Sequence, residues 1–247
     1  MQNLSIKIFD DRNALNAGAA GFWQCVADNA IVARGRFSVA LSGGSTPKAL
    51  YELLAQSPWK ESLPWSKTHI FLGDERNVPA GDPPSNFRMA NEALLSKVKI
   101  PAENIHRVRT ELKDPQKVAA DYERTLRELF PGAPWPQIDL NLLGLGENGH
   151  TASLFPHTPV LHDDKDWIAG LYIEEVKMER ITLTVPAINH SRNIAFFISG
   201  ASKAQVVHDI LHGPRDPERL PAQLIQAEAG NLIWLLDRPA AALLPNS

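Results

Sequence analysis

Short runs of apolar residues alternate along this chain with segments of helical character, and this alternation restricts the fold more than any other feature. The apolar runs predict strands at residues 4–9, 37–41, 68–72, 138–143, 181–185, 193–199 and 231–236. The pattern between them predicts helices over 11–34, 47–56, 86–97, 115–130 and 201–212. Near-continuous apolar strands separated by helices are typical of a mostly parallel sheet that is covered on both faces. The sequence therefore predicts an α/β fold.

No repeat or strongly biased segment divides the sequence, so we expect one α/β domain over residues 1–247. The formal net charge of -3 provides no basic field for nucleic acid or an acidic membrane. No apolar run has the length of a signal peptide or a membrane-spanning helix. Cys25 is the one cysteine, and its place in a helical pattern predicts a buried side chain. We therefore expect a cytoplasmic protein that binds neither nucleic acid nor membranes.

The segment after the strand 37–41 has the character of an anion site. Residues 42–48 are SGGSTPK. The two glycines allow a tight turn and a close approach to a ligand, and Thr46 and Pro47 suit the N-cap and first position of the next helix. The free N–H groups and positive end of that helix would face the turn. The predicted phosphate-binding residues are Ser42, Gly43, Gly44, Ser45 and Thr46. A glycine-rich turn that binds nothing is the alternative interpretation.

Charged residues follow the strand 68–72, where residues 73–79 are GDERNVP. Charges at the end of a buried strand are costly to place near a core without a purpose. We expect Arg76 to neutralise a phosphate or a developing oxyanion. We expect Asp74 to orient a base or to bind sugar hydroxyls. The alternative is a solvated turn with a local ion pair.

A glycine-rich segment with one histidine follows the strand 138–143, where residues 144–156 are GLGENGHTASLFP. The glycines match GxGxxG, but Pro156 prevents the long helix that a dinucleotide site needs. We therefore expect a loop that presents His150 to a ligand, because a neutral imidazole can take a proton from water near pH 7. A hydrogen-bonded structural histidine is the alternative.

Two cations outside these segments are also candidates for the site. Lys203 lies at the start of the predicted helix 201–212, and Arg180 precedes the strand 181–185. Either side chain could contact a phosphate, and either could be a solvated charge. His208 and His212 have the i, i+4 spacing of metal ligands, but the glutamate of HExxH and a third ligand are missing. We therefore expect no metal site.

Three segments together resemble one known family. They are residues 42–47, residues 73–79 with Ser85-Asn86, and the GHTASLFP string at 149–156. Weaker similarity continues in RITLT at 180–184 and in Lys203-Ala204. In this order, over about residues 39–237, the chain resembles the family of glucosamine-6-phosphate isomerases and 6-phosphogluconolactonases. The GHTASLFP string favours the 6-phosphogluconolactonase branch.

The resemblance implies a Rossmann-like α/β fold and hydrolysis of 6-phospho-D-glucono-1,5-lactone to 6-phosphogluconate in the oxidative pentose phosphate pathway. It implies no cofactor, no required metal and a phosphorylated sugar lactone as the binding partner. The sequence does not fix the oligomeric state, and we expect a monomer or small homo-oligomer. The resemblance assigns catalysis to His150, and the chemistry of their side chains adds Asp74 and Arg76 as candidate catalytic residues. The substrate-binding residues would be Ser42, Gly43, Gly44, Ser45, Thr46, Lys203 and Arg180.

The chain departs from the family pattern at one position that matters for the chemistry. The family commonly has Asp before the Gly-His pair, whereas this chain has Asn148. An amide can hydrogen-bond but cannot carry charge, so we expect Asn148 to orient the ring rather than to transfer protons.

Two other functions stay open at the level of sequence. An isomerase or deaminase of amino-sugar phosphates would share the phosphate turn, but it needs a carboxylate to move a proton between C1 and C2, and Asn148 argues against it. A sugar-phosphate sensor without catalysis would need an output surface or a DNA-binding module, and the sequence indicates neither.

Overall fold

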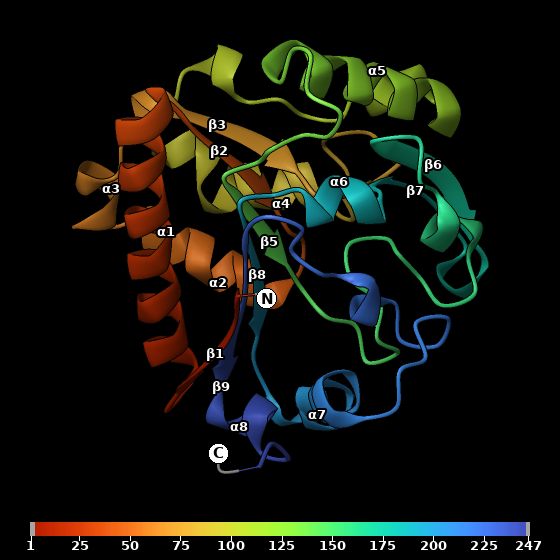
Figure 1. Cartoon of the computed structure of the whole chain (residues 1–247). Helices are drawn as coiled ribbons and strands as arrows, with labels where there is room; N and C mark the ends of the chain where they lie inside the picture. The colour runs from red at the N-terminus through yellow and green to blue at the C-terminus, as the bar shows by residue number, and fades with distance from the viewer. Residues whose placement is uncertain (1–2, 246–247) are drawn as a thin grey trace.

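A parallel sheet of six strands forms the centre of the protein, which a computed structural model describes over residues 3–245. The strand order is β1-β9-β8-β5-β2-β3, and every neighbouring pair is parallel. Figure 1 shows α1 (Arg12–Arg34) on one side of this sheet, and α6 (Val185–Asn189) and α7 (Ala204–His212) on the other. The predicted α/β class with a mostly parallel, two-sided sheet is therefore confirmed. The strands are β1 Asn3–Phe9, β2 Phe37–Leu41, β3 Thr68–Leu72, β5 Leu140–Leu143, β8 Asn193–Ile198 and β9 Asn231–Asp237.

A second, antiparallel sheet of three strands lies beside the carboxyl ends of the large one (Figure 1). Its order is β4 Asp74–Arg76, β7 Met178–Leu183 and β6 Ile168–Ile173. Helix α5 (Pro115–Leu129) packs against β6 and β7. This sheet corrects two predictions: the strand near 181–185 does not join the parallel sheet, and the charged residues 74–76 form a strand instead of a loop. Apolar periodicity shows that a segment is extended, but it does not show which sheet the segment joins.

The helices follow the predicted order, with boundaries that shift by a few residues. Helix α1 begins after Asp11, whose carboxylate accepts a hydrogen bond from Ala14 N at 2.8 Å, and ends at Gly35 with a left-handed φ of 73°. The predicted helix 86–97 is α4 followed by a 3-10 turn at Leu95–Lys97. The helices are α1 Arg12–Arg34, α2 Ser45–Leu54, α3 Trp59–Ser62, α4 Asn86–Ala93, α5 Pro115–Leu129, α6 Val185–Asn189, α7 Ala204–His212 and α8 Arg238–Ala241.

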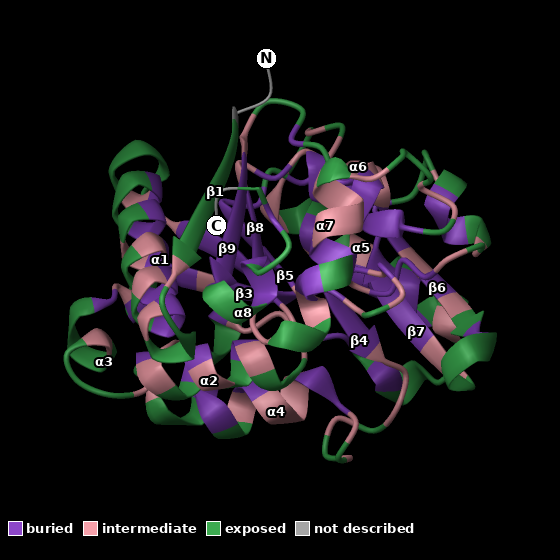
Figure 2. Cartoon of the chain, turned by 90° about the horizontal axis from the view of Figure 1, so that it is seen from below, coloured by how far each residue is buried: buried purple, intermediate pink, exposed green. Residues whose placement is uncertain are grey.

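Helix α1 has one buried stripe, and Cys25 lies outside it. The stripe is formed by Leu15, Ala19, Trp23, Val26 and Ala30, whose spacing of three and four residues places them on one face. Figure 2 shows this alternation of buried and exposed surface along α1. Cys25 is exposed, so the prediction of a buried cysteine is wrong. None of the helices within residues 3–245 has both the length and the apolar character needed to cross a membrane.

Two buried tyrosines hydrogen-bond to the backbone at the carboxyl ends of β2 and β3, next to the site. The Tyr51 hydroxyl of α2 accepts a hydrogen bond from Ser42 N at 3.0 Å and donates to Ser42 O at 2.9 Å. The Tyr122 hydroxyl of α5 does the same for Leu72, at 2.8 and 3.1 Å. Burial raises the pKa of both phenols, so each stays a neutral donor and acceptor. The ends of β2 and β3 are thus held from both sides of the sheet.

Candidate active site

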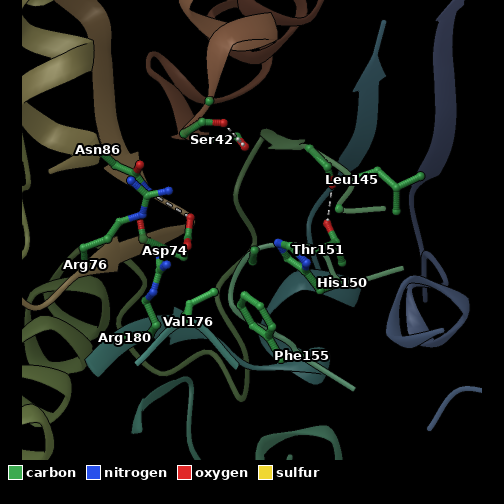
Figure 3. A pocket seen from close by; sticks show the side chains of 15 residues that line it. Ser42, Asp74, Arg76, Asn86, Leu145, His150, Thr151, Phe155, Val176 and Arg180 are labelled. Carbon is green, nitrogen blue, oxygen red and sulfur yellow. Dashed lines mark hydrogen bonds between the residues drawn. The ribbon is translucent and has the colours of Figure 1, made fainter. Parts of the chain in front are cut away.

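A cavity of about 330 Å³ opens where β2, β3 and β5 end and the small sheet begins. Residues from all three predicted segments line it, together with Arg180 of β7. Figure 3 shows the polar side chains that surround this space. The predicted site residues on its wall are Ser42, Gly43, Gly44, Asp74, Arg76, His150 and Arg180. Segments that are far apart in sequence therefore meet at one edge of the sheet, where ligands of such folds bind.

The glycine turn after β2 differs from the prediction in its helix start. Helix α2 begins at Ser45, and Gly44 occupies the N-cap position with φ 106°, a conformation that strongly favours glycine. Thr46 is therefore not the N-cap, and Pro47 is the third helical residue. The sequence predicted a later start because Thr46 has a side chain that can cap a helix. In the structure, Gly44 is the N-cap and makes no side-chain capping hydrogen bond. The N–H groups of Ser45 and Thr46 still belong to the first turn, where no intrahelical partner exists.

The remaining predicted phosphate ligands line a second, smaller cavity of about 170 Å³ next to the first. Ser45, Thr46 and Lys203 are on its wall, and Gly43 and Gly44 belong to both cavities. Lys203 is the last residue of a 3-10 turn, Ala201–Lys203, that is separated from the end of β8 by two residues. A small anion in this space would meet a helix start, hydroxyl groups and one ammonium group.

The charged strand β4 is held by an unusually dense set of hydrogen bonds. The buried Glu75 carboxylate accepts from the backbone N–H groups of Arg76, Asn86 and Phe87 at 2.6–2.8 Å, and from the Ser85 hydroxyl at 3.0 Å. Burial raises the pKa of Glu75, and these hydrogen bonds oppose that effect. Glu75 thus anchors the start of α4 to β4 and does not line the cavity.

Asp74 points into the cavity but does not touch the imidazole. Its carboxylate accepts hydrogen bonds from Ser153 Oγ at 2.7 Å and from Asn86 Nδ2 at 3.1 Å. The expectation that Asp74 orients the base therefore does not match the geometry, since Asn148 makes the ring contact instead. Asn86 also restricts the glycine turn, because a Cβ on Gly43 would lie 2.0 Å from Asn86 Oδ1. The roles of Asn86 and Ser153 were not predicted from the sequence.

Arg76 and Arg180 place two guanidinium groups on the same wall. They are paired across the antiparallel strands β4 and β7, and the Nε atom of each is buried without a hydrogen-bond partner in the described chain. Arg76 donates to Pro84 O at 2.5 Å. Burial and the charge of Arg76 lower the pKa of Arg180. Holding the buried Arg180 beside the half-buried Arg76 is costly because the two charges are alike, and an anionic ligand between them would offset that cost.

His150 lies in a loop whose backbone leaves little freedom. Gly149 and Ala152 have φ values of 82° and 48°, in the left-handed region. A Cβ on Gly146 would lie 2.1 Å from His150 Nδ1, so the ring needs a glycine there. The imidazole stacks on Phe155 with 4.0 Å between ring centroids and an interplanar angle of 11°. These contacts fix the ring plane beside the cavity.

The two nitrogens of the His150 ring have different partners. Nδ1 lies 2.5 Å from Asn148 Oδ1, which also accepts from the His150 backbone N–H at 3.1 Å. Because an amide oxygen only accepts, Nδ1 carries the proton in this arrangement. Nε2 makes no hydrogen bond to any residue between 3 and 245, so its lone pair is available to a ligand. The geometry agrees with the expected orienting contact of Asn148.

The electrostatic surroundings keep the His150 imidazole neutral. Burial lowers the pKa of His150 to about 4, and Arg180, Lys203 and Arg76 act in the same direction, while Asp74 opposes them. A base must be neutral to accept a proton, so a lowered pKa extends its active form toward acid. We expect kcat/KM of the free enzyme to stay high through neutral pH and to fall as the pH drops through about 4.

A pH–rate profile checks this expectation. The substrate phosphate titrates near pH ~6 and adds its own limb, so the diagnostic limb is the one near pH 4. The profile of an unphosphorylated lactone, which lacks the phosphate limb, is the matched control. If kcat/KM for the unphosphorylated lactone instead fell near pH ~6.5, the ordinary pKa of histidine, burial would not lower the pKa of His150.

Comparison with known proteins places the chain in a family. The model of the glucosamine-6-phosphate isomerases/6-phosphogluconolactonase family matches residues 10–234, a range that contains every segment of the site. The chain belongs to this family. A 6-phosphogluconolactonase of Synechocystis sp. is 46% identical over 214 residues, covering 85% of this chain and 86% of the relative. One from Nostoc sp. is 42% identical over 242 residues, covering 97% and 98%.

Solved structures of the family have the same fold. The 6-phosphogluconolactonase from Trypanosoma cruzi superposes with a TM-score of 0.87 at 28% identity, covering 99% of this chain and 98% of that chain. The resemblance seen in the sequence and the Rossmann-like fold that it implies are thereby confirmed. Within residues 3–245, no group of three or more His, Cys, Asp or Glu side chains is arranged to hold a metal ion.

Proposed function

We propose that this member of the family hydrolyses 6-phospho-D-glucono-1,5-lactone to 6-phosphogluconate in the oxidative pentose phosphate pathway, with His150 as the general base. The observation that carries the proposal is the free Nε2 of a neutral imidazole in the same cavity as the glycine turn and two arginines. The relatives named 6-phosphogluconolactonase, which match nearly the whole chain, support the choice of substrate. We also propose a cytoplasmic location, as the sequence predicts.

In the proposed complex the phosphate occupies the smaller cavity, against the start of α2 and Lys203. The sugar ring then extends across Gly43 and Gly44, which border both cavities, and its C1 carbonyl reaches the larger cavity beside His150. Arg76 and Arg180 face this larger space, where an oxyanion develops during acyl transfer. Asp74 is left to accept hydrogen bonds from sugar hydroxyls.

In the proposed reaction, one nitrogen of His150 first accepts a proton and later donates it. Nε2 of His150 takes a proton from water while the water oxygen bonds to C1, and the carbonyl oxygen becomes the oxyanion. When the bond between C1 and the ring oxygen breaks, Nε2–H returns that proton to the ring oxygen, which becomes the C5 hydroxyl. The new carboxylic acid loses its proton to solvent. A base placed in this way contributes about 10²–10⁴-fold.

A coupled assay on freshly generated lactone tests the function. The product is oxidised by a 6-phosphogluconate dehydrogenase, and the rate without protein is subtracted because the lactone also opens in water. We expect turnover that saturates with the phosphorylated lactone. Release of ammonia from glucosamine 6-phosphate, with no acceleration of lactone opening, would instead assign the protein to the isomerase branch.

Lys203→Ala tests the position of the phosphate. We expect KM to rise about 10-fold or more with kcat changed by less than about 3-fold, because a lost charge-assisted hydrogen bond costs about 1.5–3 kcal/mol of binding. Lys48→Ala is the control, since Lys48 is an exposed cation of α2 that pairs with Glu52. A Lys203→Ala enzyme with unchanged KM would remove Lys203 from the phosphate site.

A further inference from the structure

Asn148 connects His150 to a carboxylate from the small sheet. Glu175 belongs to the 3-10 turn Glu174–Val176 that joins β6 to β7. Asn148 Nδ2 donates to both carboxylate oxygens of Glu175, at 2.9 and 3.0 Å. The opposite end of the same amide, Oδ1, contacts His150. A surface turn and the imidazole are therefore joined through one side-chain amide.

This contact is one of two that set which way the Asn148 amide faces, and the other is the hydrogen bond from the His150 backbone N–H to Oδ1. A carboxylate only accepts hydrogen bonds, so the amide must turn its NH₂ group toward Glu175 and its oxygen toward the ring. The oxygen then requires a proton on His150 Nδ1 and leaves the lone pair on Nε2. If the amide rotated by half a turn, its NH₂ group would face Nδ1 and favour the tautomer with the proton on Nε2. That tautomer cannot accept a proton from water at Nε2.

We propose that Glu175 is a positioning residue, which locks the Asn148 amide and thereby holds His150 in the tautomer that is active as a base. The catalytic part of this inference rests on the proposed function, whereas the tautomer part does not. A carboxylate acceptor also polarises the amide, which strengthens the hydrogen bond at its other end. The same turn brings Val176 to the wall of the larger cavity.

The expected size of the effect follows from what remains when Glu175 is removed. The His150 backbone N–H still donates to Asn148 Oδ1 at 3.1 Å, so the active orientation loses only one of its two constraints. Glu175 is exposed, and exposed charges contribute modestly. We therefore expect a partial loss of kcat, about 3- to 30-fold, and not the loss expected when the base itself is removed.

Three variants test the inference. Glu175→Ala removes both acceptors, and Glu175→Gln keeps one amide oxygen that can accept from Asn148 Nδ2. Glu174→Ala is the matched control, because Glu174 is an exposed residue of the same type in the same turn. Two quantities are measured on each: kcat and KM for the lactone, and the ¹⁵N chemical shifts of the His150 ring, which distinguish the two tautomers. The His150 resonances are identified by their absence from the spectrum of His150→Ala.

In Glu175→Ala we expect the lower kcat with KM within about 2-fold of the wild-type value, and a measurable population with the proton on Nε2. Glu175→Gln restores most of both properties, and Glu174→Ala is unchanged. The inference requires both changes together, so a wild-type kcat or a wild-type tautomer in Glu175→Ala would overturn it. If the wild-type protein opens no lactone, the proposed function fails, and the nitrogen shifts alone decide whether Glu175 sets the tautomer.

Discussion

Replacing His150 by alanine is expected to lower kcat about 10²–10⁴-fold, the contribution of one positioned general base. The imidazole is neutral, one of its nitrogens is held by Asn148, and the other is free beside the cavity. The substrate would still meet the glycine turn and the cations, so KM should change by only a few-fold. Initial rates in the coupled assay, with the uncatalysed rate subtracted, measure both constants.

The control for this variant is His208→Ala, which removes a half-buried histidine of α7 that lines neither cavity. Thermal unfolding of both variants shows whether the loss of the Phe155 stacking contact affects stability. A folded His150→Ala enzyme that retains near-wild-type kcat would remove His150 from the role of base.

Removal of the substrate phosphate is expected to have a comparably large effect on the wild-type enzyme. Unphosphorylated glucono-1,5-lactone should be hydrolysed with a kcat/KM about 10²–10⁴-fold lower. This range corresponds to two lost charge-assisted hydrogen bonds, together about 3–6 kcal/mol, at 1.4 kcal/mol per tenfold change. The candidate partners are the first turn of α2 and Lys203.

Lys203→Ala provides the internal control for phosphate recognition. If Lys203 contacts the phosphate, this variant loses activity on the phosphorylated lactone and almost none on the unphosphorylated one, so the ratio between the two substrates shrinks. Equal kcat/KM values for both lactones in the wild-type enzyme would show that no phosphate anchor exists.

The sequence predicted the residues of the cavity well because parallel strands end at one edge. Ser42, Asp74 and His150 follow β2, β3 and β5 in the chain, and the order of these strands in the sheet is β5-β2-β3. Once the sheet is known to be parallel, the segments after neighbouring strands must meet. Local patterns such as SGGS were sufficient to indicate a turn that could approach a ligand.

The contacts across the small sheet could not be predicted in the same way. Arg180 reaches the cavity because β7 pairs with β4 in a register that opposes Arg76, and no local pattern encodes that pairing. The contact between Asn148 and Glu175 could not be predicted for the same reason, because the two residues are 27 positions apart in the sequence. The residue that orients His150 could not be predicted either, because it depends on the direction in which side chains point. Asp74 could orient an imidazole, but its carboxylate accepts hydrogen bonds from Asn86 and Ser153 instead.

A crystal structure of the wild-type protein with 6-phosphogluconate tests most directly whether the base and the anion site serve one substrate. We expect the phosphate to lie against the start of α2 and Lys203, and the C1 carboxylate to lie within about 3.5 Å of His150 Nε2, a distance suited to reaction. A phosphate bound between Arg76 and Arg180, with C1 turned away from His150, would contradict this expectation.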